Sequence, residues 1–338
     1  MTVPDRDPNR VLVTGATGFV GAAVVRQLLA RGAAVRILRR ATSALDLLGA
    51  AGARVEHAVG DLADPEAVGE AVAECGAVVH CAAAVAFGPG AADTLHRVNV
   101  VGTATVVDAC LRAGVRRLVH VSSIAALGRT AGGSAAPIDE TAVWTDSPAN
   151  TAYAVSKHRA EREVQRGVAK GLDAVIVNPA VVFGPGRPGE NTMAVAERAM
   201  RGMPVAPSGG TAVVDVEDVA AGVLAALDRG ETGRRYVLAG ENLSWREILG
   251  TLARAAGAAP PTRTVPPALL TLAGVVAELA SRLGLPTALT RETARTASRT
   301  DRYAAGRAER ELGVSFRPFA ETAARIAAAR IAASSAAR

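Results

Sequence analysis

Apolar runs of four or five residues alternate with stretches of helical periodicity over the first half of the chain. The apolar runs lie at residues 10–14, 34–38, 54–57, 77–80, 117–121 and 173–177. Between them, apolar positions recur three and four residues apart near 20–29, 65–73, 93–113 and 151–170, which predicts helices. Continuously apolar strands that alternate with helices are typical of a parallel sheet covered on both faces. We therefore expect the α/β class, with a doubly wound parallel sheet.

The alternation loosens after residue 184. Residues 184–189 and 201–210 are rich in proline and glycine and predict loops. Later segments have helical spacing, at 217–227, 244–256, 267–283 and 303–312. This order predicts a large α/β domain over residues 8–184, to which a segment at about 211–230 returns, and a smaller, mostly helical part over 185–330.

The composition is ordinary for a soluble globular protein. Hydrophobic residues make up 49% and charged residues 21% of the 338 positions. The formal net charge is +6, and Lys157 and Lys170 are the only lysines, so the basic side is almost all arginine. Because acidic and basic residues are interleaved and aromatic residues make up only 3%, we expect no nucleic-acid partner.

The cysteine pattern predicts neither disulfides nor a metal site. Cys75, Cys81 and Cys110 lie in apolar surroundings without the CxxC spacing, which fits a reducing cytoplasm. The first residues show no apolar core of a signal peptide. The longest stretch without Asp, Glu, Lys or Arg, residues 75–92, contains histidine, glycine and proline, so we expect no transmembrane helix.

The sharpest local signal is TGATGFVG at residues 14–21, which follows a predicted strand and opens a predicted helix. In such a loop, Gly15 allows a tight turn, Gly18 lets the backbone approach a pyrophosphate, and Gly21 allows close packing of helix and strand. The amides of the first helical turn then face the phosphates. The motif predicts that the large domain binds a dinucleotide.

The end of the second strand bears on the choice of dinucleotide. Arg39 and Arg40 stand there, 24 residues after Gly15, and no acidic residue occupies 38–40. An acid at this point binds the ribose of NAD, whereas arginine accommodates the 2′-phosphate of NADP, so NADP is favoured over NAD. Asp61 and Leu62 follow the third strand, where an acid can meet the adenine edge. An equally simple interpretation makes Asp61 a loop residue that caps the next helix.

A phenol and an ammonium group are spaced for one helix face. Tyr153 and Lys157 lie four residues apart in the predicted helix over 151–170. A nearby cation stabilises a phenolate, so the pair can donate a proton to a carbonyl that receives hydride. Ser122 and Ser123 end the strand at 117–121, and a serine there can bind the substrate oxygen, although either serine could instead cap a helix.

Together these residues resemble the extended short-chain dehydrogenase/reductase family, within the epimerase/dehydratase superfamily. The matching stretches are TGATGFVG at 14–21, Asp61, HCAA at 80–83, NVVGT at 99–103, the serines at 122–123, YAVSK at 153–157 and NPAVVFGP at 178–185. The resemblance covers about residues 10–320 and is strongest to the dihydroflavonol-4-reductase-like branch. It implies a Rossmann-type fold with a substrate-binding C-terminal part, and a homodimer.

The resemblance also implies roles for single residues. Ser123 would be the catalytic serine and Tyr153 the acid/base, while Lys157 would bind the nicotinamide ribose and tune Tyr153. Asn99 would hold the active-site helix and a proton-relay water. The implied cofactor site consists of Gly15, Thr17, Gly18, Phe19, Val20, Gly21, Arg39, Arg40, Asp61, Leu62, Ala82, Ala83, Lys157, Pro179 and Val182.

Three functions remain open on these residues. The first is an NADPH-dependent reductase of a ketone or aldehyde, favoured because Arg39 stands where epimerases commonly have an acid. The second is a nucleotide-sugar epimerase or dehydratase, which Asn178 keeps open and for which Arg187 is the local candidate to meet a diphosphate. The third, a non-catalytic nucleotide-sensing protein, is disfavoured by the intact Ser123, Tyr153 and Lys157.

The substrate site is the least defined part of the sequence. Candidate lining residues are Phe87, Trp144, Asn178, Phe183 and Met193. Residues 265–285 carry an apolar stripe that predicts either a lid over a bulky apolar substrate or a helix that covers the core. The stripe comprises Leu269, Leu272, Val276, Leu279 and Leu283.

Two further patterns could bear on the substrate. Arg291, Arg295, Arg299 and Arg302 are spaced for one helix face, either solvated or binding a phosphate-bearing substrate. Asp215 stands where the family commonly has a histidine, so any substrate contact borrowed for that position is in doubt.

Overall fold

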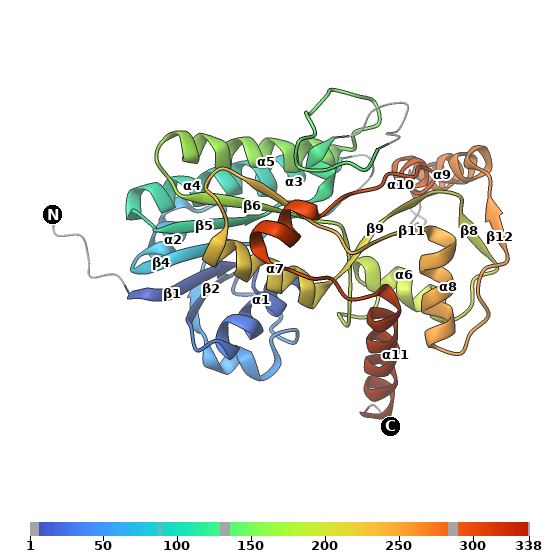
Figure 1. The fold of residues 1–338 in the computed structure, drawn as a ribbon, viewed down its shortest axis with the longest axis horizontal. Coiled ribbons are helices and arrows are strands. Elements are labelled where there is room, and N and C mark those ends of the chain that lie inside the picture. Colours follow the sequence, from blue (N-terminus) through green and yellow to red (C-terminus); the bar gives the residue numbers. More distant parts are fainter. Residues whose placement is uncertain (1–6, 87, 89, 129–135, 283–289, 337–338) are drawn as a thin grey trace.

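A seven-stranded parallel sheet forms the centre of the computed structural model, which describes residues 7–86, 88, 90–128, 136–282 and 290–336 (Figure 1). The strand order is β10-β6-β5-β4-β1-β2-β3, and all neighbours run parallel. The strands are β1 (Asp7–Thr14), β2 (Ala34–Arg39), β3 (Glu56–Val59), β4 (Cys75–His80), β5 (Arg117–Val121), β6 (Ala174–Pro179) and β10 (Arg235–Leu238). The predicted α/β class with a doubly wound sheet is confirmed.

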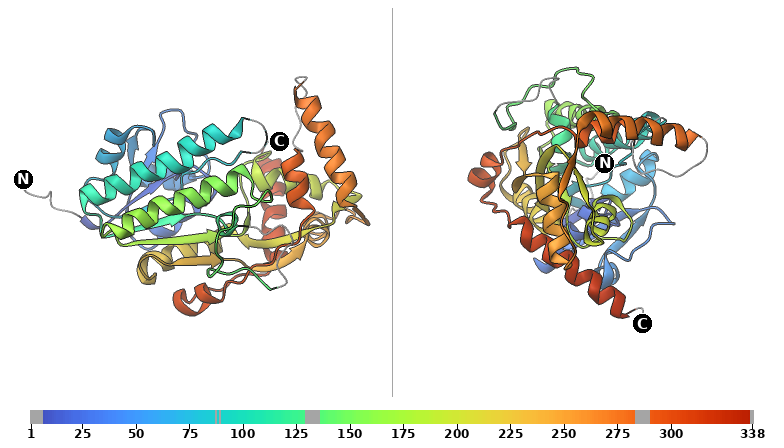
Figure 2. Two further views of the ribbon diagram at one scale, coloured as in Figure 1. Left: turned by 90° about the horizontal axis from the view of Figure 1, so that it is seen from above. Right: turned by 90° about the vertical axis from the view of Figure 1, so that its right-hand side faces the viewer.

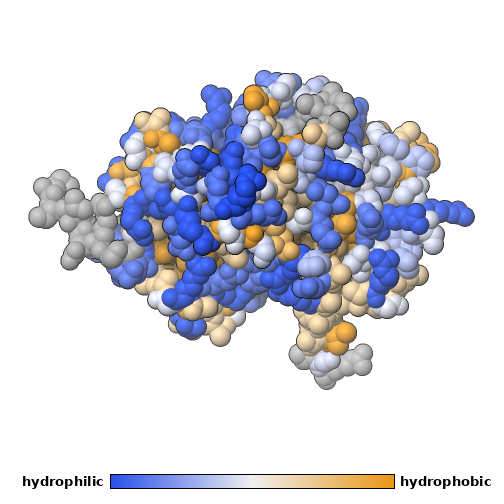
Figure 3. All heavy atoms as spheres, viewed as in Figure 1, coloured by the Kyte–Doolittle hydropathy of each residue, from blue (hydrophilic) through white to orange (hydrophobic). Residues whose placement is uncertain are grey.

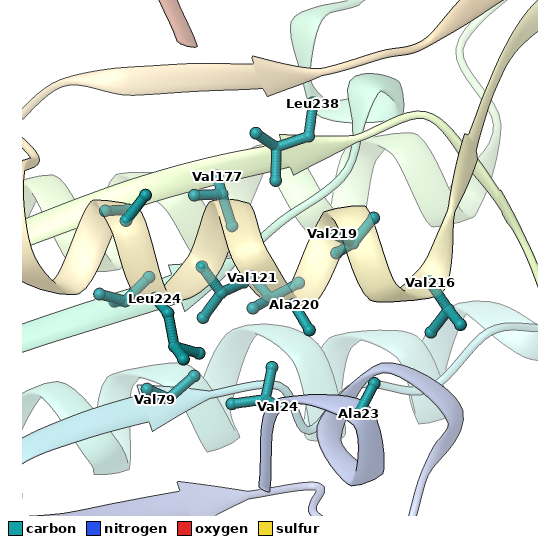
Figure 4. Close-up of a cluster of buried hydrophobic side chains, with 14 of the residues drawn as sticks. Ala23, Val24, Val79, Val121, Val177, Val216, Val219, Ala220, Leu224 and Leu238 are labelled. Carbon is teal, nitrogen blue, oxygen red and sulfur yellow. The ribbon is translucent and has the colours of Figure 1, made fainter. Parts of the chain in front are cut away.

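Side chains alternate in direction along each strand, so the sheet has two apolar faces. In β1, Val11 and Val13 join one core cluster, whereas Leu12 joins the other. Helices α1 (Phe19–Ala30) and α7 (Val216–Arg229) cover the first face. Figure 4 shows α7 lying across that face, with Val216, Val219, Ala220 and Leu224 in the buried cluster that the helix shares with the strands and α1. The second face is covered by α2 (Pro65–Val72), α4 (Gly102–Ala113) and α5 (Ala152–Ala169).

The six predicted strands are present, with β3 displaced two residues toward the C-terminus. The seventh strand, β10, was not predicted, because a four-residue segment that begins with arginine gives a weak strand signal. Only part of the segment at about 211–230, which was predicted to return to the large domain, does so. Its helix α7 covers the large sheet, whereas β9 (Gly210–Asp215) lies in a separate three-stranded sheet. There β9 pairs in parallel with β7 (Val181–Phe183) and antiparallel with β11 (Glu241–Ser244).

The smaller part packs around its own apolar cluster, which includes Phe183, Met193, Ile248 and Phe319. Its helices are α6 (Asn191–Met200), α8 (Trp245–Ala255), α9 (Pro267–Arg282), α10 (Arg291–Ala297) and α11 (Phe319–Ala336). Strands β8 (Val205–Pro207) and β12 (Arg263–Val265) form a third, two-stranded sheet. Short helical turns lie at Gly49–Arg54, Ile124–Leu127 and Ala308–Leu312.

Helix α9 presents its apolar stripe to solvent. Leu269, Leu272 and Val276 are each 58% exposed. Gly274 lies on the opposite side of the helix, where a Cβ would come within 2.9 Å of the Thr290 carbonyl oxygen beside α10. Figure 2 shows α9 as an outlying helix at one end of the molecule. The exposed stripe therefore does not cover the core at these three residues, whereas the lid over a bulky substrate stays a prediction. The Leu279 side chain and Leu283 lie outside the described residues.

The four arginines do not share a helix face, because α10 ends at Ala297, before Arg299 and Arg302. Helix α11 ends in an alanine-rich segment that projects from the body, with Ile331 67% exposed (Figures 1 and 3). Among the described residues, no helix combines the length and the apolar character needed to cross a membrane.

Candidate active site

The phosphate loop folds at the point where the strand order reverses between β1 and β4. Gly15 has φ +67°, and a Cβ there would lie 2.5 Å from the Ala82 nitrogen. A Cβ at Gly21 would lie 2.2 Å from the Gly15 carbonyl oxygen. The backbone itself thus requires these two glycines. The close approach also brings Ala82, one of the predicted cofactor residues, against the loop, and Ala83 follows it in the chain.

Gly18 differs from the other two glycines. Its Cβ would meet only the Gly15 carbonyl oxygen, at 3.2 Å, so the fold leaves room on this side of the loop. Gly18 is the N-cap of α1, whose first turn contains no acidic residue. Free amides at a helix N-terminus attract phosphate, and a side chain at Gly18 would fill the space that a phosphate needs. The loop therefore fits the pyrophosphate of a dinucleotide.

The loop after β7, at residues 184–189, crosses the phosphate loop. The ring of Phe19 lies 3.1 Å from where a Cβ of Gly186 would stand, while Val20 packs partly buried against the core. Arg187 donates from Nη2 to the Thr17 carbonyl oxygen at 3.1 Å and to Asp46 Oδ1 at 2.7 Å. The Arg187 guanidinium, by this hydrogen bond, lowers the pKa of Asp46. Arg187 is thus engaged between two loops on the phosphate-loop side.

The end of β2 carries the two predicted arginines. Arg39 donates from Nε to His57 Nδ1 at 2.9 Å and from Nη1 to the Arg40 carbonyl oxygen at 3.2 Å, and the Arg40 side chain is exposed. Asp61 accepts from the Ala63 amide at 2.9 Å, while Leu62 contacts Gly102. The helix cap predicted as an alternative for Asp61 is supplied by Asp64, which accepts from the amides of Glu66 and Ala67.

Tyr153 and Ser123 meet at the carboxyl end of the sheet. Their side chains are hydrogen-bonded to each other. Burial raises the pKa of the Tyr153 phenol, and the hydrogen bond with Ser123 opposes that rise. Ser123 also caps the turn at Ile124–Leu127 by accepting from the Ala125 amide at 3.2 Å, so its position is fixed by the backbone. Ser123 thus has the helix-cap role predicted as an alternative, and it also contacts Tyr153, which was not predicted.

Lys157 lies one turn beyond Tyr153 on α5 and is fully buried. Its Nζ donates to the Val121 carbonyl oxygen at 2.8 Å, which ties α5 to the end of β5. Burial lowers the pKa of Lys157 to about 8, and the nearby carboxylate of Glu161 acts in the opposite direction. An ammonium group with this pKa can lose its charge within the working range of an enzyme.

Asn99 lies in a π-helical turn, His96–Val101, that interrupts the predicted helix over 93–113 between α3 (Ala91–Leu95) and α4. Its Oδ1 accepts from the Ala84 amide at 2.7 Å, and its Nδ2 donates to the Ala84 carbonyl oxygen and to Ser156 Oγ at 2.9 Å. Asn99 thus holds the segment after β4 against α5, which carries Tyr153 and Lys157. Such π turns are frequent at functional sites.

Comparison with known proteins shows the family of the chain. The model of the NAD dependent epimerase/dehydratase family matches residues 11–239. The chain belongs to this family. It is 38% identical over 263 residues, 77% of this chain and 78% of the relative, to the sterol demethylase protein B of Methylococcus capsulatus. It is 35% identical over 260 residues, 74% and 76% of the two chains, to the 2-alkyl-3-oxoalkanoate reductase of Stenotrophomonas maltophilia.

Among solved structures, that of gox2253 matches with a TM-score of 0.82 and 34% identity, covering 96% of this chain and 98% of that one. The match confirms the Rossmann-type fold. As an epimerase/dehydratase-family member of the extended short-chain dehydrogenase/reductase type, the chain is an NAD(P)-dependent enzyme of oxidoreductase or epimerase type. The open space beside Gly18, at the N-terminus of α1, fits the pyrophosphate of that nicotinamide cofactor.

The predicted substrate residues do not gather at one place. Phe183 and Met193 are buried in the core of the smaller part. Trp144 stacks on His158, with ring centroids 4.2 Å apart, and covers Gly128. Asn178 is fully buried below Ser123. Phe87 lies outside the described residues. Of the predicted cofactor residues, Pro179 ends β6 of the large sheet and Val182 lies in β7 of the three-stranded sheet, so the two flank the connection between these sheets.

Asp215, which stands where the family commonly has a histidine, connects two helices of the fold. Its buried carboxylate caps α7 by accepting from the Glu217 amide at 2.8 Å. It also accepts from Thr322 Oγ1 at 2.8 Å and lies 2.6 Å from Arg325 Nη1. These contacts fasten α11 to the N-terminus of α7. Among the described residues, no group of three or more His, Cys, Asp or Glu side chains is placed to hold a metal ion.

The polar network beneath Ser123 was not predicted from the sequence. Glu161, one turn beyond Lys157, joins Ser122, Asn178 and Arg235 in a buried cluster. The available signal was its spacing: positions 153, 157 and 161 share one helix face, so a third polar residue lies on the face that carries the predicted catalytic pair.

Proposed function

We propose that this protein is an NADPH-dependent reductase that converts the ketone or aldehyde of a bulky, apolar small molecule to an alcohol. The observation that carries the proposal is the hydrogen bond between Tyr153 and Ser123, with buried Lys157 one turn along the same helix. A proton donor, an oxygen-binding hydroxyl and a cation are thereby grouped at the edge of the sheet where ligands bind.

Each residue has a defined part in this reduction. A bound NADPH supplies hydride to the carbonyl carbon. Ser123 donates a hydrogen bond to the carbonyl oxygen, and the phenol of Tyr153 gives its proton to that oxygen, so that an alcohol and a phenolate result. Lys157 stabilises the phenolate by its positive charge and binds the nicotinamide ribose. Solvent then returns a proton to Tyr153.

The two arginines at the end of β2 support NADP as the cofactor. Arg39 is partly buried and anchored to His57, whereas the Arg40 guanidinium is exposed. No acidic residue occupies 38–40, and the nearest acid of the following loop, Asp46, is paired with Arg187. A guanidinium binds a phosphate with charge-assisted hydrogen bonds, which a ribose hydroxyl cannot match.

The two residues that kept the sugar-nucleotide alternative open, Arg187 and Asn178, are both engaged in contacts within the protein, and this weakens that alternative. Arg187 is engaged with Asp46 and the Thr17 carbonyl oxygen, and Asn178 is buried with its amide donating to Ser123 and Glu161. The named reductase among the relatives acts, by its name, on a 2-alkyl-3-oxoalkanoate, a carbonyl compound with apolar chains. A carbonyl substrate with a large apolar part is therefore our proposal.

The test offers two classes of substrate in parallel with NADPH. One set contains benzil, 1-tetralone, cinnamaldehyde and a 3-ketosteroid, and the other contains UDP- and dTDP-sugars. We expect NADPH oxidation with at least one member of the first set. Turnover or tight binding confined to the sugar nucleotides would reject the reductase and support the epimerase or dehydratase.

We further propose a homodimer in the cytoplasm, without a nucleic-acid partner. The family resemblance supports the dimer, and the interleaving of acidic and basic residues argues against a nucleic-acid surface. Light scattering of the purified protein, with and without added DNA, tests both points: the expected mass is that of two chains and does not change with DNA.

A further inference from the structure

A buried carboxylate lies directly beneath the catalytic serine. Glu161 is 1% exposed, although its neighbours Arg159 and Arg162 on the same helix are exposed. Its Oε1 accepts hydrogen bonds from Ser122 Oγ at 2.5 Å and from Asn178 Nδ2 at 2.6 Å. A carboxylate is buried at considerable cost unless charged and hydrogen-bonding partners surround it.

The second oxygen of Glu161 meets a cation from the edge of the sheet. Arg235 Nε, on β10, lies 2.8 Å from Glu161 Oε2. Glu161 therefore joins three strands to α5: β5 through Ser122, which follows its end, β6 through Asn178, and β10 through Arg235. The Asn178 amide also donates to the carbonyl oxygen of Ser123 at 2.9 Å. The backbone on both sides of the Ser123 side chain is thus held by this cluster.

Glu161 also acts on the catalytic lysine. It lies four residues after Lys157 on one face of α5 and favours the ammonium form of that lysine. The other titratable groups near Lys157 are Tyr153, one turn earlier on α5, and Cys81, His80 and His120; burial keeps both histidines neutral by lowering their pKa values. Among these described groups, Glu161 is the carboxylic acid that acts to raise the pKa of Lys157.

We propose that Glu161 is a positioning residue for the reduction: it holds the Ser122–Ser123 turn against α5 and balances the positive charge of Lys157. This inference rests on the proposed function for its chemical meaning. Glu161 does not touch the reacting atoms; it acts through Ser123, which binds the carbonyl oxygen, and through Lys157, which stabilises the phenolate.

The charge part of the proposal has a readout that needs no substrate. Because the chain has two lysines, lysine labelled with ¹⁵N and ¹³C gives two side-chain NMR signals, and the exposed Lys170 serves as internal reference. We expect Glu161→Gln to lower the pKa of Lys157 by about one unit, since it removes an opposite charge one helical turn away. The matched control, Glu163→Gln, alters a carboxylate on the same helix that pairs with Arg166, and should leave Lys157 unchanged.

The positioning part needs a variant that keeps the charge. Glu161→Asp retains the carboxylate but draws it back by one methylene group, away from Ser122 and Asn178. We expect the Lys157 titration to stay within about 0.3 unit of the wild type. With benzil as substrate, kcat should fall about 10- to 100-fold because Ser123 is displaced, while KM and NADPH affinity change little.

The outcomes separate the possibilities. An unshifted Lys157 titration in folded Glu161→Gln, or wild-type kcat in Glu161→Asp, would overturn the positioning role. If Glu161→Gln does not fold, because its amide would face the donor of Arg235, the kcat of Glu161→Asp decides alone. Absence of ketone turnover by the wild-type protein would instead count against the proposed function, and the NMR titration would still decide whether Glu161 sets the charge of Lys157.

Discussion

Arg187 binds Asp46 and the carbonyl oxygen of Thr17 with the same terminal nitrogen, at 2.7 and 3.1 Å. Three segments far apart in the sequence meet at this guanidinium: the loop after β7, the loop after β2 and the phosphate loop. The loop after β7 is therefore tied to the phosphate loop by the hydrogen bond between Arg187 and the Thr17 carbonyl oxygen.

Removing this guanidinium should weaken cofactor binding. Arg187→Ala loses a partly exposed ion pair and the hydrogen bond to Thr17, so we expect NADPH to dissociate about fivefold faster, the equivalent of ~1 kcal/mol. Stopped-flow release of NADPH measures this rate. Arg31→Ala, which breaks the exposed pair with Asp228 on another surface, is the control and should release NADPH as the wild type does.

Cofactor preference should depend on the end of β2. NADPH should bind more tightly than NADH by about 1.5–3 kcal/mol, the value of one charge-assisted contact to the 2′-phosphate. Arg40→Asp should reverse the order, because the new carboxylate repels the phosphate and accepts from the ribose hydroxyl. Fluorescence titration with both cofactors provides the measurement, with Arg112→Asp on exposed α4 surface as control. Equal dissociation constants in the wild type would contradict the assignment.

Tyr153→Phe keeps the ring and removes the proton that reduction requires. We expect turnover to fall by about 10²–10⁴ while NADPH affinity barely changes. Initial rates with the best ketone, together with NADPH titration, give both quantities. Lys157→Ala should reduce both, because this residue is assigned to the ribose as well as to the phenol. Retained turnover in Tyr153→Phe would mean that another group supplies the proton.

The pH dependence should follow Lys157. Burial lowers its pKa to about 8, whereas burial raises that of Tyr153, so the lysine loses its proton first as the pH rises. We expect kcat/KM for reduction to fall about tenfold per pH unit above pH ~8.

The contribution of Lys157 to the free energy of unfolding should instead increase as the pH rises over that range. Between about 8 and 10.5 the unfolded chain binds more protons at this lysine than the folded one, so its contribution to the free energy of unfolding increases with pH. Thermal melts recorded alongside the rates test this sign. A loss of activity that parallels a loss of Tm would show that unfolding, rather than Lys157, limits the rate.

Asp215 should contribute to stability and not to chemistry. Asp215→Asn weakens its contacts with Arg325 and Thr322 and loosens α11, and we expect a loss of about 2 kcal/mol in the free energy of unfolding. Urea denaturation measures it. Asp228→Asn, which affects an exposed ion pair, should cost less than ~0.5 kcal/mol. A loss of turnover without destabilisation would return Asp215 to the substrate site.

Features that depend on local order could be predicted from the sequence. Strands such as residues 117–121 are buried on both faces, so their continuously apolar composition alone predicts them. Gly15 and Gly21 could be predicted because the turn that they form requires glycine. Contacts between distant segments could not be predicted. Arg187 is paired with Asp46 across 141 positions, and Leu269 and Leu272 have helical spacing that says nothing about which neighbour, if any, covers them.

Glu161 shows the same limit within the site. A glutamate between Arg159 and Arg162 has the pattern of a solvated helix, and its burial depends on Ser122, Asn178 and Arg235 from three other segments. Asn178 was predicted from its motif alone, and its amide proves to be directed at Ser123 and Glu161 within the fold.

The π turn at His96–Val101 makes this helix intolerant of changes in length. The extra residue turns Asn99 toward Ala84 and Ser156, and the side chain of Thr103 donates to the Asn99 carbonyl oxygen at 2.6 Å. Deleting Val100 would let a regular α-helix run from Ala91 to Ala113, with more uniform backbone hydrogen bonds. The same deletion would rotate Asn99 by about 100° relative to α4 and separate it from both partners. An engineer who shortened this helix for stability would thus be expected to obtain a firmer helix and a loosened active site.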